Sequence, residues 1–298
     1  MDLVSLSIFR AVANELSVTK AAQQLGRYPS SVTTRLQQLE EELGVPLFDR
    51  EKKAFVLTSA GEQFLNYANR ILNLSDEAKD VVNPSTPSGV LRVGSMECTI
   101  ASRLPPVLAT FSNKWPSVTF DLTTAPTRQL TQAVQRYEID CAFVAFPKDE
   151  WWADIDGLEK TRIVTEELLL ILPPGHPPVN QPKDVLPQRM AAFARGCAYR
   201  SVAEDWLTGY GTSDRHFQIN EVKSYHAIIA SVSAGSCVGA VPRSVLELNR
   251  SMSPVESISL AEIDTYLIWR QDAQTSAVKA FKEAVLATDF ATRRSVEG

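Results

Sequence analysis

Residues 18–50 combine two short helical patterns with a break between them at residues 26–29. Apolar residues recur at intervals of four, three and four in the second pattern, which predicts one buried stripe along a helix, formed by Val32, Leu36, Leu39 and Leu43. The opposite face carries short hydrogen-bonding side chains and no carboxylate before Glu40: Ser30, Thr33, Thr34, Gln37 and Gln38. Such a face suits the edges of bases in a DNA major groove.

The neighbouring residues extend this segment into a small domain. A first helix is expected over residues 3–14, with its core-facing side formed by Leu3, Leu6, Phe9, Val12 and Ala13. Helices over residues 18–25 and 30–43 follow, and the second should end at Gly44, a usual C-terminal stop. Short strands at residues 45–48 and 55–57 would flank a charged turn. This order predicts a winged helix-turn-helix domain over residues 1–58.

The charge of the chain is uneven along its length. The 298 residues carry a formal net charge of −5, which does not favour DNA binding. Charges beyond a Debye length of about 8 Å are screened, however, so local fields decide the attraction of phosphate. Two basic groups lie in the N-terminal segment, the first without an acidic neighbour: Lys20, Arg27 and Arg35, then Arg50, Lys52 and Lys53.

A long helix is predicted over residues 59–82. Thr58 is a candidate N-cap, and Glu62 falls in the first turn. A heptad-like seam follows along one side of the helix, through Phe64, Ala68, Ile71, Ser75, Ala78 and Val82. A helix of this length has no core of its own, so we expect it to pair with a second copy of the chain. The alternative is that it packs back on its own domain.

The remainder of the chain has an α/β pattern. Residues 83–89 have the composition of a hinge. Helical stretches, the first over residues 99–113, then alternate with strand-like stretches at residues 90–95, 118–124, 140–146, 167–173, 191–194, 216–220, 238–242 and 266–270. This alternation predicts a parallel sheet covered on both faces. Two lobes, residues 90–162 with 267–298 and residues 163–266, would enclose a cleft at strand carboxyl ends and helix N-termini.

Other classes of protein are disfavoured. The sequence lacks a run of eighteen apolar residues, and its N-terminal stretch has an early acid and helical periodicity, unlike a secretory signal. The cysteines are widely spaced without a CxxC motif, which argues against structural zinc and favours a reducing cytoplasm. Patterns such as GxSxG, HExxH or paired carboxylates are also missing, so neither catalysis nor a cofactor is expected.

Several stretches carry a resemblance to a known family: FRAVANELSVTKAAQQL at residues 9–25, LEEELGVPLFDR at 39–50, LTSAGEQFL at 57–65 and GSCVGAVPRSVL at 235–246. In this order they resemble the LysR-type transcriptional regulators over essentially the whole chain. The resemblance implies a homo-oligomer, usually a dimer of dimers, that binds an inverted repeat with a T-N11-A core near promoters. It further implies a periplasmic-binding-protein-like effector domain that senses a small molecule.

The chain departs from the family pattern at one place. Most members have Ser-Gln-Pro followed by Ala or Ser where this chain has Tyr28, Pro29, Ser30 and Ser31. The amide and proline that usually approach the bases are displaced or missing, which puts the base preferences of the half-site in doubt. Stretches such as MECT at residues 96–99 and EVKSYH at residues 221–226 are most similar to a subgroup that includes putrescine-utilisation regulators.

Two candidate sites follow. The predicted base-reading residues are Ser30, Ser31, Thr33, Thr34 and Gln37, and the predicted phosphate contacts are Lys20, Arg27, Arg35, Arg50, Lys52 and Lys53. The predicted effector-binding residues are Ser95, Met96, Glu97, Cys98, Thr99, Phe146, Cys197, Tyr199, Arg200, Ser201, Glu221 and Tyr225. A solvated helix face is the alternative for the first group.

The chemistry of the effector stays open at this point. Arg200 could hold a carboxylate by a bidentate pair, whereas Glu97 and Glu221 could receive ammonium groups. Both together would fit an amino acid, and the two glutamates alone would fit a di- or polyamine. Alternatively, Arg200 pairs with Glu221 as a structural bridge. Cys98 and Cys197 are each expected near a helix N-terminus, where a thiolate is favoured. If the lobes bring them together, a redox switch is one hypothesis, and inert thiols are the other.

The function that these features favour is a ligand-responsive transcriptional regulator in the cytoplasm. Its expected partners are double-stranded promoter DNA, RNA polymerase, further copies of the chain in a homodimer or homotetramer, and an amine, amino acid or carboxylate as effector. The alternative is a solute-binding or small-molecule-converting protein on the same two-lobed fold, which the N-terminal unit disfavours.

Overall fold

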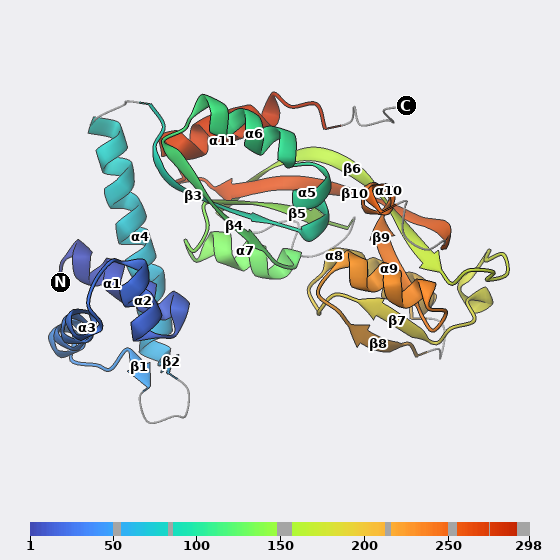
Figure 1. Ribbon diagram of the computed structural model, residues 1–298, viewed down its shortest axis with the longest axis horizontal. Coiled ribbons are helices and arrows are strands. Elements are labelled where there is room, and N and C mark those ends of the chain that lie inside the picture. Colours follow the sequence, from blue (N-terminus) through green and yellow to red (C-terminus); the bar gives the residue numbers. More distant parts are fainter. Residues whose placement is uncertain are drawn as a thin grey trace. The chain divides into compact units, whose positions relative to one another are not determined.

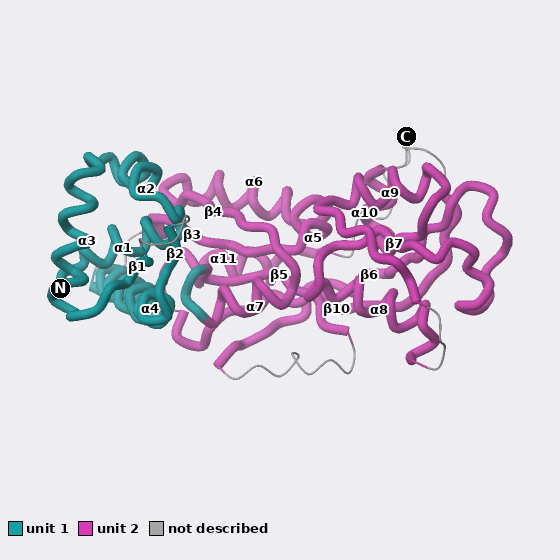
Figure 2. Tube along the Cα trace, turned by 90° about the horizontal axis from the view of Figure 1, so that it is seen from below, with its two compact units in different colours: residues 1–85, 136–138 teal, residues 86–135, 139–298 magenta. Residues whose placement is uncertain are grey.

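The computed structural model describes residues 1–49, 55–82, 86–147, 157–211, 216–249, 255–273 and 275–290. The chain divides into two compact units, drawn in different colours in Figure 2. The first unit comprises Met1–Ser85 with Arg136–Glu138, and the second comprises Thr86–Gln135 with Ile139–Gly298.

Three helices form the centre of the first unit (Figure 1): α1 (Leu3–Glu15), α2 (Val18–Gln24) and α3 (Pro29–Leu43). The first two begin at side-chain caps, because Asp2 Oδ1 accepts from Ser5 N at 2.7 Å and Ser17 Oγ accepts from Lys20 N at 3.4 Å. Gly44 ends α3 with a φ of 71°, a left-handed conformation that glycine adopts without steric cost. The predicted order of helices is confirmed.

The core of this unit draws on all three helices. Its buried apolar side chains include Leu6, Phe9, Val12, Ala21, Ala22, Val32, Leu36 and Leu39. The prediction was wrong for Leu3, which is 43% exposed. Leu3 is the first residue of α1, so its side chain lies at the helix end and not over the core.

The hairpin of the first unit is shorter than predicted. β1 (Phe48–Asp49) pairs antiparallel with β2 (Val56–Leu57), with Phe48 opposite Leu57. Pro46 has no N–H to donate to a strand neighbour, so the predicted start of the strand at residue 45 is not formed. Helix, turn, helix and hairpin nevertheless follow in the predicted order.

α4 (Ser59–Val82) is the long helix that the sequence predicts. Thr58 Oγ1 accepts a hydrogen bond from Gly61 N at 3.0 Å, so Thr58 is the N-cap. Burial decreases along the predicted seam, because Ala68 is fully buried whereas Ala78 and Val82 are exposed. The second half of α4 therefore lies outside the core of the first unit. Its pairing with another copy of the chain stays a prediction.

The second unit contains one sheet, which has eight strands within the described residues, in the order β4-β3-β5-β10-β6-β9-β7-β8. Its strands are β3 (Gly89–Ser95), β4 (Val118–Thr124), β5 (Cys141–Phe146), β6 (Leu158–Leu172), β7 (Arg189–Ala192), β8 (Gln218–Glu221), β9 (Val238–Pro242) and β10 (Glu256–Arg270). We call the part with β3, β4 and β5 lobe I and the part with β7, β8 and β9 lobe II.

The two central strands correct the prediction of a parallel sheet. Strands within each lobe are parallel, but β6 and β10 run antiparallel to each other and to their outer neighbours. The chain passes from lobe I to lobe II along β6 and returns along β10, so these strands must run in opposite directions. They pair from Leu158 opposite Arg270 to Leu172 opposite Glu256, far beyond the stretches predicted for them. The predicted lobe boundaries, 162–163 and 266–267, fall within these strands and stay predictions.

Helices cover both faces of the sheet in lobe I (Figure 1): α6 (Pro105–Lys114) and α11 (Ser276–Leu286) on one face, and α7 (Thr127–Gln135) on the other. Side chains of β5 alternate between these faces, because Phe143 packs in the cluster with α6 and α11 whereas Val144 packs in the cluster with α7. Lobe II carries α8 (Ala198–Leu207), α9 (Tyr225–Ser233) and α10 (Arg243–Leu248).

The helix predicted over residues 99–113 is divided in two. α5 (Glu97–Ser102) ends at Arg103, and α6 begins at Pro105. Pro105 and Pro106 have no N–H groups, so they fit the first turn of a new helix and not the interior of a long one. This division leaves Glu97 in the first turn of a short helix, next to the carboxyl end of β3.

Candidate functional site

The side of α3 opposite its buried stripe faces solvent. Ser30, Ser31, Thr34 and Gln37 are exposed, and Thr33 is half-buried. The hydroxyls of Thr33 and Thr34 donate to backbone carbonyls one turn earlier, both at 3.0 Å. A hydroxyl oxygen that donates in this way keeps lone pairs that can accept from a base. The structure therefore places the predicted base-reading side chains together on one side of a helix.

The N-terminus of α3 has features of an anion site. Tyr28, 81% exposed, occupies the N-cap position, Pro29 follows, and within the described chain no side chain caps the helix. Backbone N–H groups at such an end carry partial positive charge and suit a phosphate oxygen.

The predicted phosphate contacts fall in two groups. Lys20, Arg27 and Arg35 are exposed. Arg35 Nη1 also lies 3.3 Å from Asp2 Oδ2, but both side chains are about half exposed, so this ion pair is weak and leaves the guanidinium accessible. The others, Arg50, Lys52 and Lys53, lie outside the described residues.

Glu40, the first acid along α3, has a structural role that the sequence pattern did not reveal. Its Oε1 accepts hydrogen bonds from the backbone N–H groups of Leu47 at 2.7 Å and Phe48 at 3.1 Å. The carboxylate is therefore held against the start of the hairpin. Its hydrogen bonds direct it toward the hairpin and not toward the helix face formed by residues 30–37.

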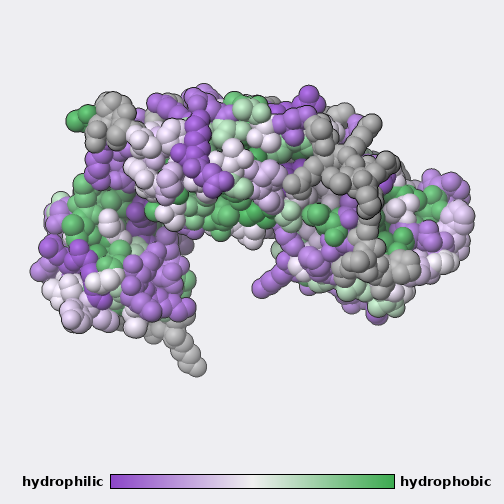
Figure 3. Space-filling model, turned by 45° about the horizontal axis from the view of Figure 1, so that its top comes forward, coloured by the Kyte–Doolittle hydropathy of each residue, from purple (hydrophilic) through white to green (hydrophobic). Residues whose placement is uncertain are grey.

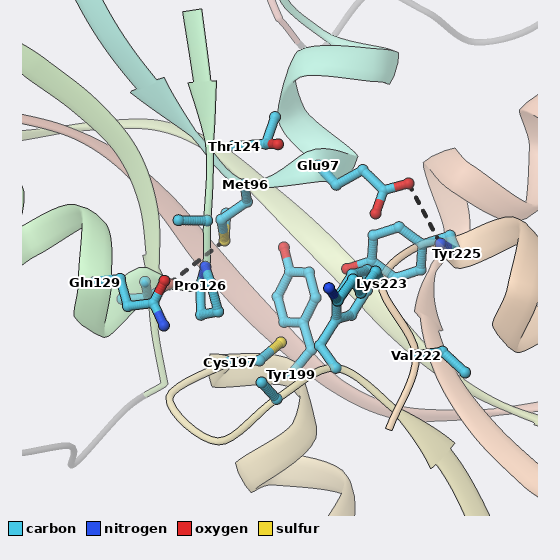
Figure 4. A pocket seen from close by; sticks show the side chains of 14 residues that line it. Met96, Glu97, Thr124, Pro126, Gln129, Cys197, Tyr199, Val222, Lys223 and Tyr225 are labelled. Atoms are coloured by element: carbon cyan, nitrogen blue, oxygen red, sulfur yellow. Dashed lines mark hydrogen bonds between the residues drawn. The ribbon is translucent and has the colours of Figure 1, made fainter. Parts of the chain in front are cut away.

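The second unit contains a cavity of about 400 Å³, shown in Figure 4. This volume is in the usual range for a small-molecule site. Residues from both lobes line it, at the carboxyl ends of strands and the starts of helices. Five predicted effector residues are among them: Met96, Glu97, Cys197, Tyr199 and Tyr225.

Seven predicted residues do not line this cavity: Ser95, Cys98, Thr99, Phe146, Arg200, Ser201 and Glu221. Ser95 is buried and donates to the carbonyl of Met96 at 2.9 Å, and the ring of Phe146 packs against Tyr266 with centroids 5.8 Å apart. Each is the last residue of its strand, β3 or β5, and both side chains are buried in the packing around the sheet and not in the cavity wall.

Arg200 forms the structural bridge that was one of the alternatives. Its Nη1 donates to Glu221 Oε1 at 2.9 Å and to the carbonyl of Phe193 at 2.8 Å, and its Nε donates to Glu204 Oε1 at 3.0 Å. Only 6% of the Arg200 side chain is exposed. With two carboxylates and one carbonyl already bound, the guanidinium is not free to clamp a carboxylate ligand.

Residues that the sequence analysis missed complete the cavity wall. They are Thr124, Ala125, Pro126, Thr127 and Gln129 at the junction of β4 and α7, Phe193 and Ala194 after β7, and Val222 and Lys223 after β8. The sequence held a signal for them, because each group lies at or just after the carboxyl end of a predicted strand, where parallel sheets bind ligands.

Glu97 is the acidic residue of the wall. Its Oε1 accepts from Tyr225 N at 3.3 Å, whereas its Oε2 is buried and has no hydrogen-bond partner within the described part of the chain. Burial raises the pKa of this carboxyl, and the Tyr225 N–H only partly offsets that effect. Figure 4 shows the two oxygens of Glu97, one toward the backbone of Tyr225 and one toward the interior.

The structure does not favour a thiolate at Cys98 or Cys197, which the redox hypothesis requires. Burial raises the pKa of the Cys98 thiol to about 12, and burial also raises the pKa of the Cys197 thiol. Both stay protonated at neutral pH although they lie at the starts of α5 and α8. The Cys98 thiol donates to the hydroxyl of Tyr199 at 3.9 Å, so it packs as a small, neutral group.

Comparison with known proteins decides the family. The model for the LysR substrate binding domain matches residues 84–289, and the model for the bacterial regulatory helix-turn-helix protein of the lysR family matches residues 3–62. The chain belongs to the LysR family. It is similar to the HTH-type transcriptional regulator GltR of Bacillus subtilis (34% identical, covering 94% of this chain and 95% of GltR). The regulator YofA of Bacillus subtilis is 33% identical, covering 96% of this chain and 98% of YofA.

Solved structures share the fold of this LysR-family regulator. Full-length OxyR from Pseudomonas aeruginosa matches with a TM-score of 0.72 at 18% identity, over 100% of this chain and 99% of that one. Full-length CbnR in complex with its target DNA matches with a TM-score of 0.60 at 24% identity, over 96% of this chain and 99% of that one. The regulator therefore has a DNA-binding helix-turn-helix unit followed by an effector-binding α/β unit.

Two further findings concern this regulator. None of its described helices is both long and apolar enough to span a bilayer, and the face in Figure 3 carries hydrophilic residues on both units. The relatives named above do not bear on the narrower likeness to putrescine-utilisation regulators, which stays a prediction.

Proposed function

We propose that this regulator reads an inverted-repeat promoter site through residues 30–37 of α3, and that a small molecule in the 400 Å³ cavity controls the reading. The observation that carries the first part is the exposed hydroxyl- and amide-lined side of α3, free of carboxylates. The observation that carries the second is a cavity lined by both lobes, with a carboxylate oxygen in its wall that has no partner among the described residues.

Contacts to DNA divide into two kinds. Ser30, Ser31, Thr33, Thr34 and Gln37 contact base edges and set the sequence preference. The uncapped N-terminus of α3 and the basic residues bind phosphates, which fixes the register of the helix. Lys20, Arg27 and Arg35 are the described members of this basic group, and Arg50, Lys52 and Lys53 belong to it by sequence.

An inverted repeat calls for two copies of α3. Paired helix-turn-helix units contact half-sites about one helical turn, 34–36 Å, or a multiple of it apart. α4 supplies the pairing surface, because its exposed residues include the apolar side chains of Tyr67 and Leu74. The family resemblance supports a homodimer that assembles into a homotetramer.

Control of transcription follows as a population shift. A ligand that binds both walls of the cavity favours one arrangement of the lobes, and its differential affinity limits how far it can shift the equilibrium. In a tetramer such a shift changes the bend of the bound DNA and the contact with RNA polymerase. The regulator works in the cytoplasm and has no catalytic role, in keeping with relatives that are named transcriptional regulators.

Thr34→Ala tests the base-reading surface. We expect it to weaken binding to the cognate half-site by about 1–3 kcal/mol, because one base contact is lost. Binding to unrelated DNA and the melting temperature should stay unchanged, since Thr34 is exposed. Gel shifts at fixed salt, with the intergenic DNA beside the regulator's own gene and with a scrambled duplex, provide the measurement.

Arg27→Ala is the matched control for Thr34→Ala. Loss of a phosphate contact should weaken binding to both duplexes alike and reduce the slope of log K against log salt by about one. Equal affinity of wild type and Thr34→Ala for the intergenic DNA would refute the assignment of Thr34.

A further inference from the structure

We propose that the cavity takes a small molecule with a primary ammonium group, and that the free oxygen of Glu97 binds this group. The inference rests on the proposed function, in which this cavity is the effector site. It adds the chemical class of the effector, which neither the family nor the named relatives supply.

The first support is the incomplete hydrogen bonding of Glu97. One carboxylate oxygen accepts from Tyr225 N, and the other is buried without a donor in the described chain. An unsatisfied buried charge is costly, and its usual remedy is a hydrogen-bonded cation. A ligand ammonium supplies both the charge and the N–H donor. Arg200, the one cation among the predicted effector-binding residues, is already bound to Glu204 and Glu221.

The second support is the aromatic character of the wall. Phe193, Tyr199 and Tyr225 all line the cavity, and the rings of Phe193 and Tyr225 are held edge to face with centroids 4.8 Å apart. Aromatic faces attract ammonium groups, and the attraction grows where water is excluded. Figure 4 shows Glu97, Tyr199 and Tyr225 in the wall of the same cavity, with the carboxylate of Glu97 turned toward the backbone of Tyr225. A cation beside Glu97 would therefore meet both a carboxylate and aromatic rings.

The wall also contains one ammonium of its own, that of Lys223. No ion pair between Lys223 and Glu97 is present in the described chain, so Lys223 does not satisfy the free oxygen. A ligand with a carboxylate at its other end could use Lys223, whereas a diamine could not. The shared requirement is the ammonium group, and Lys223 distinguishes an amino acid from a diamine.

A series of four-carbon probes tests the proposal. 1,4-Diaminobutane and 4-aminobutanoic acid carry an ammonium group, whereas butane-1,4-diol and butanoic acid do not. Binding to the full-length protein is measured by calorimetry and thermal shift at millimolar concentration. We expect at least one amine to bind and raise the melting temperature, and its affinity to exceed that of the matched amine-free probe at least tenfold.

Three variants locate the interaction. Glu97→Gln keeps the shape of the side chain and should reduce amine affinity at least tenfold. Glu221→Gln removes a carboxylate that lies outside the cavity and should leave amine affinity unchanged. Lys223→Met should weaken 4-aminobutanoic acid only, if that probe is the one that binds. Melting curves of the unliganded variants show whether each is folded.

The outcomes separate this inference from the proposed function. Equal binding of amine-free probes, unchanged amine affinity in Glu97→Gln, or no amine binding at all would overturn the ammonium assignment. The effector site itself is tested by Ala194→Trp, which puts a bulky side chain in the cavity wall. Its response to effector is compared with that of the wild type in a promoter reporter. If the two responses are equal, the cavity is not the control site, whatever the class of ligand.

Discussion

Gly61→Ala is expected to unfold the first unit and abolish specific DNA binding. Gly61 lies in the first turn of α4, and a Cβ at this position would overlap the backbone carbonyl oxygen of Leu47 and lie 2.9 Å from Leu57 Cδ2. The same carbonyl accepts from Thr58 N at 2.9 Å, so it cannot move without breaking the link between hairpin and helix. Overpacking against backbone should cost about 3 kcal/mol or more.

Hydrogen exchange of the full-length protein provides the measurement for Gly61→Ala. Peptides from α1 to α4 should lose protection, whereas peptides from the sheet of the second unit should keep it. Gly26→Ala is the matched control, because Gly26 has a φ of +61° and a Cβ added there would meet no neighbouring atom within 4 Å. It should cost only the left-handed strain of about 1–2 kcal/mol. Unchanged protection of α4 in Gly61→Ala would contradict the close approach.

Arg103→Met is expected to destabilise the second unit by about 3–5 kcal/mol. Arg103 Nε lies 2.6 Å from Glu166 Oε1, and Arg103 Nη1 donates to the carbonyl of Phe290 at 3.2 Å. The two side chains are 15% and 5% exposed, so loss of the guanidinium leaves a carboxylate buried without its partner. The free energy of unfolding in urea, followed by hydrogen exchange in β6, provides the measurement.

Two further variants show whether the loss of stability in Arg103→Met comes from the unpaired carboxylate of Glu166. Adding Glu166→Gln to Arg103→Met should recover part of the lost stability, because an amide is cheaper to bury than an unpaired carboxylate. Lys79→Met breaks the exposed pair with Asp76 and should cost less than about 1 kcal/mol. If the double variant were as unstable as the single one, packing and not charge would explain the effect.

Local patterns predicted most elements of the first unit. The stripe of Val32, Leu36 and Leu39 is buried, and Thr58 caps α4 as its sequence position indicated. These features depend on residues within one or two turns of each other, so periodicity and capping rules suffice. Leu3 was misplaced because the pattern does not say where along a helix the core ends.

Long-range pairing could not be derived from the same rules. The N-terminal parts of β6 and β10 mix charged and apolar residues, and each becomes a strand because it pairs with the C-terminal part of the other, across about a hundred positions of sequence. Local sequence patterns indicate neither whether two such strands are parallel or antiparallel nor how long they are. For this reason the sheet was expected to be parallel throughout, and both strands were predicted at about half their length or less.

The candidate cavity was predicted in part for the same reason. Met96, Glu97 and Tyr199 were identified because each lies at or near the start of a helix that follows a strand. Thr127 and Lys223 were missed because strand order decides which of these junctions face the same space. The engagement of Arg200 by Glu221 depends on β7 and β8 being neighbours, which the sequence does not state.

The position of β10 in the sheet has a consequence for the folding of this protein during translation. β10 lies between β5 and β6, so a nascent chain that stops before residue 256 has two sheet fragments with unpaired edges facing each other. The helix-turn-helix unit can fold early during translation, whereas the sheet can close only when the last strand has left the ribosome. Nonsense mutations late in the gene should therefore yield insoluble chains, and not a smaller sensor.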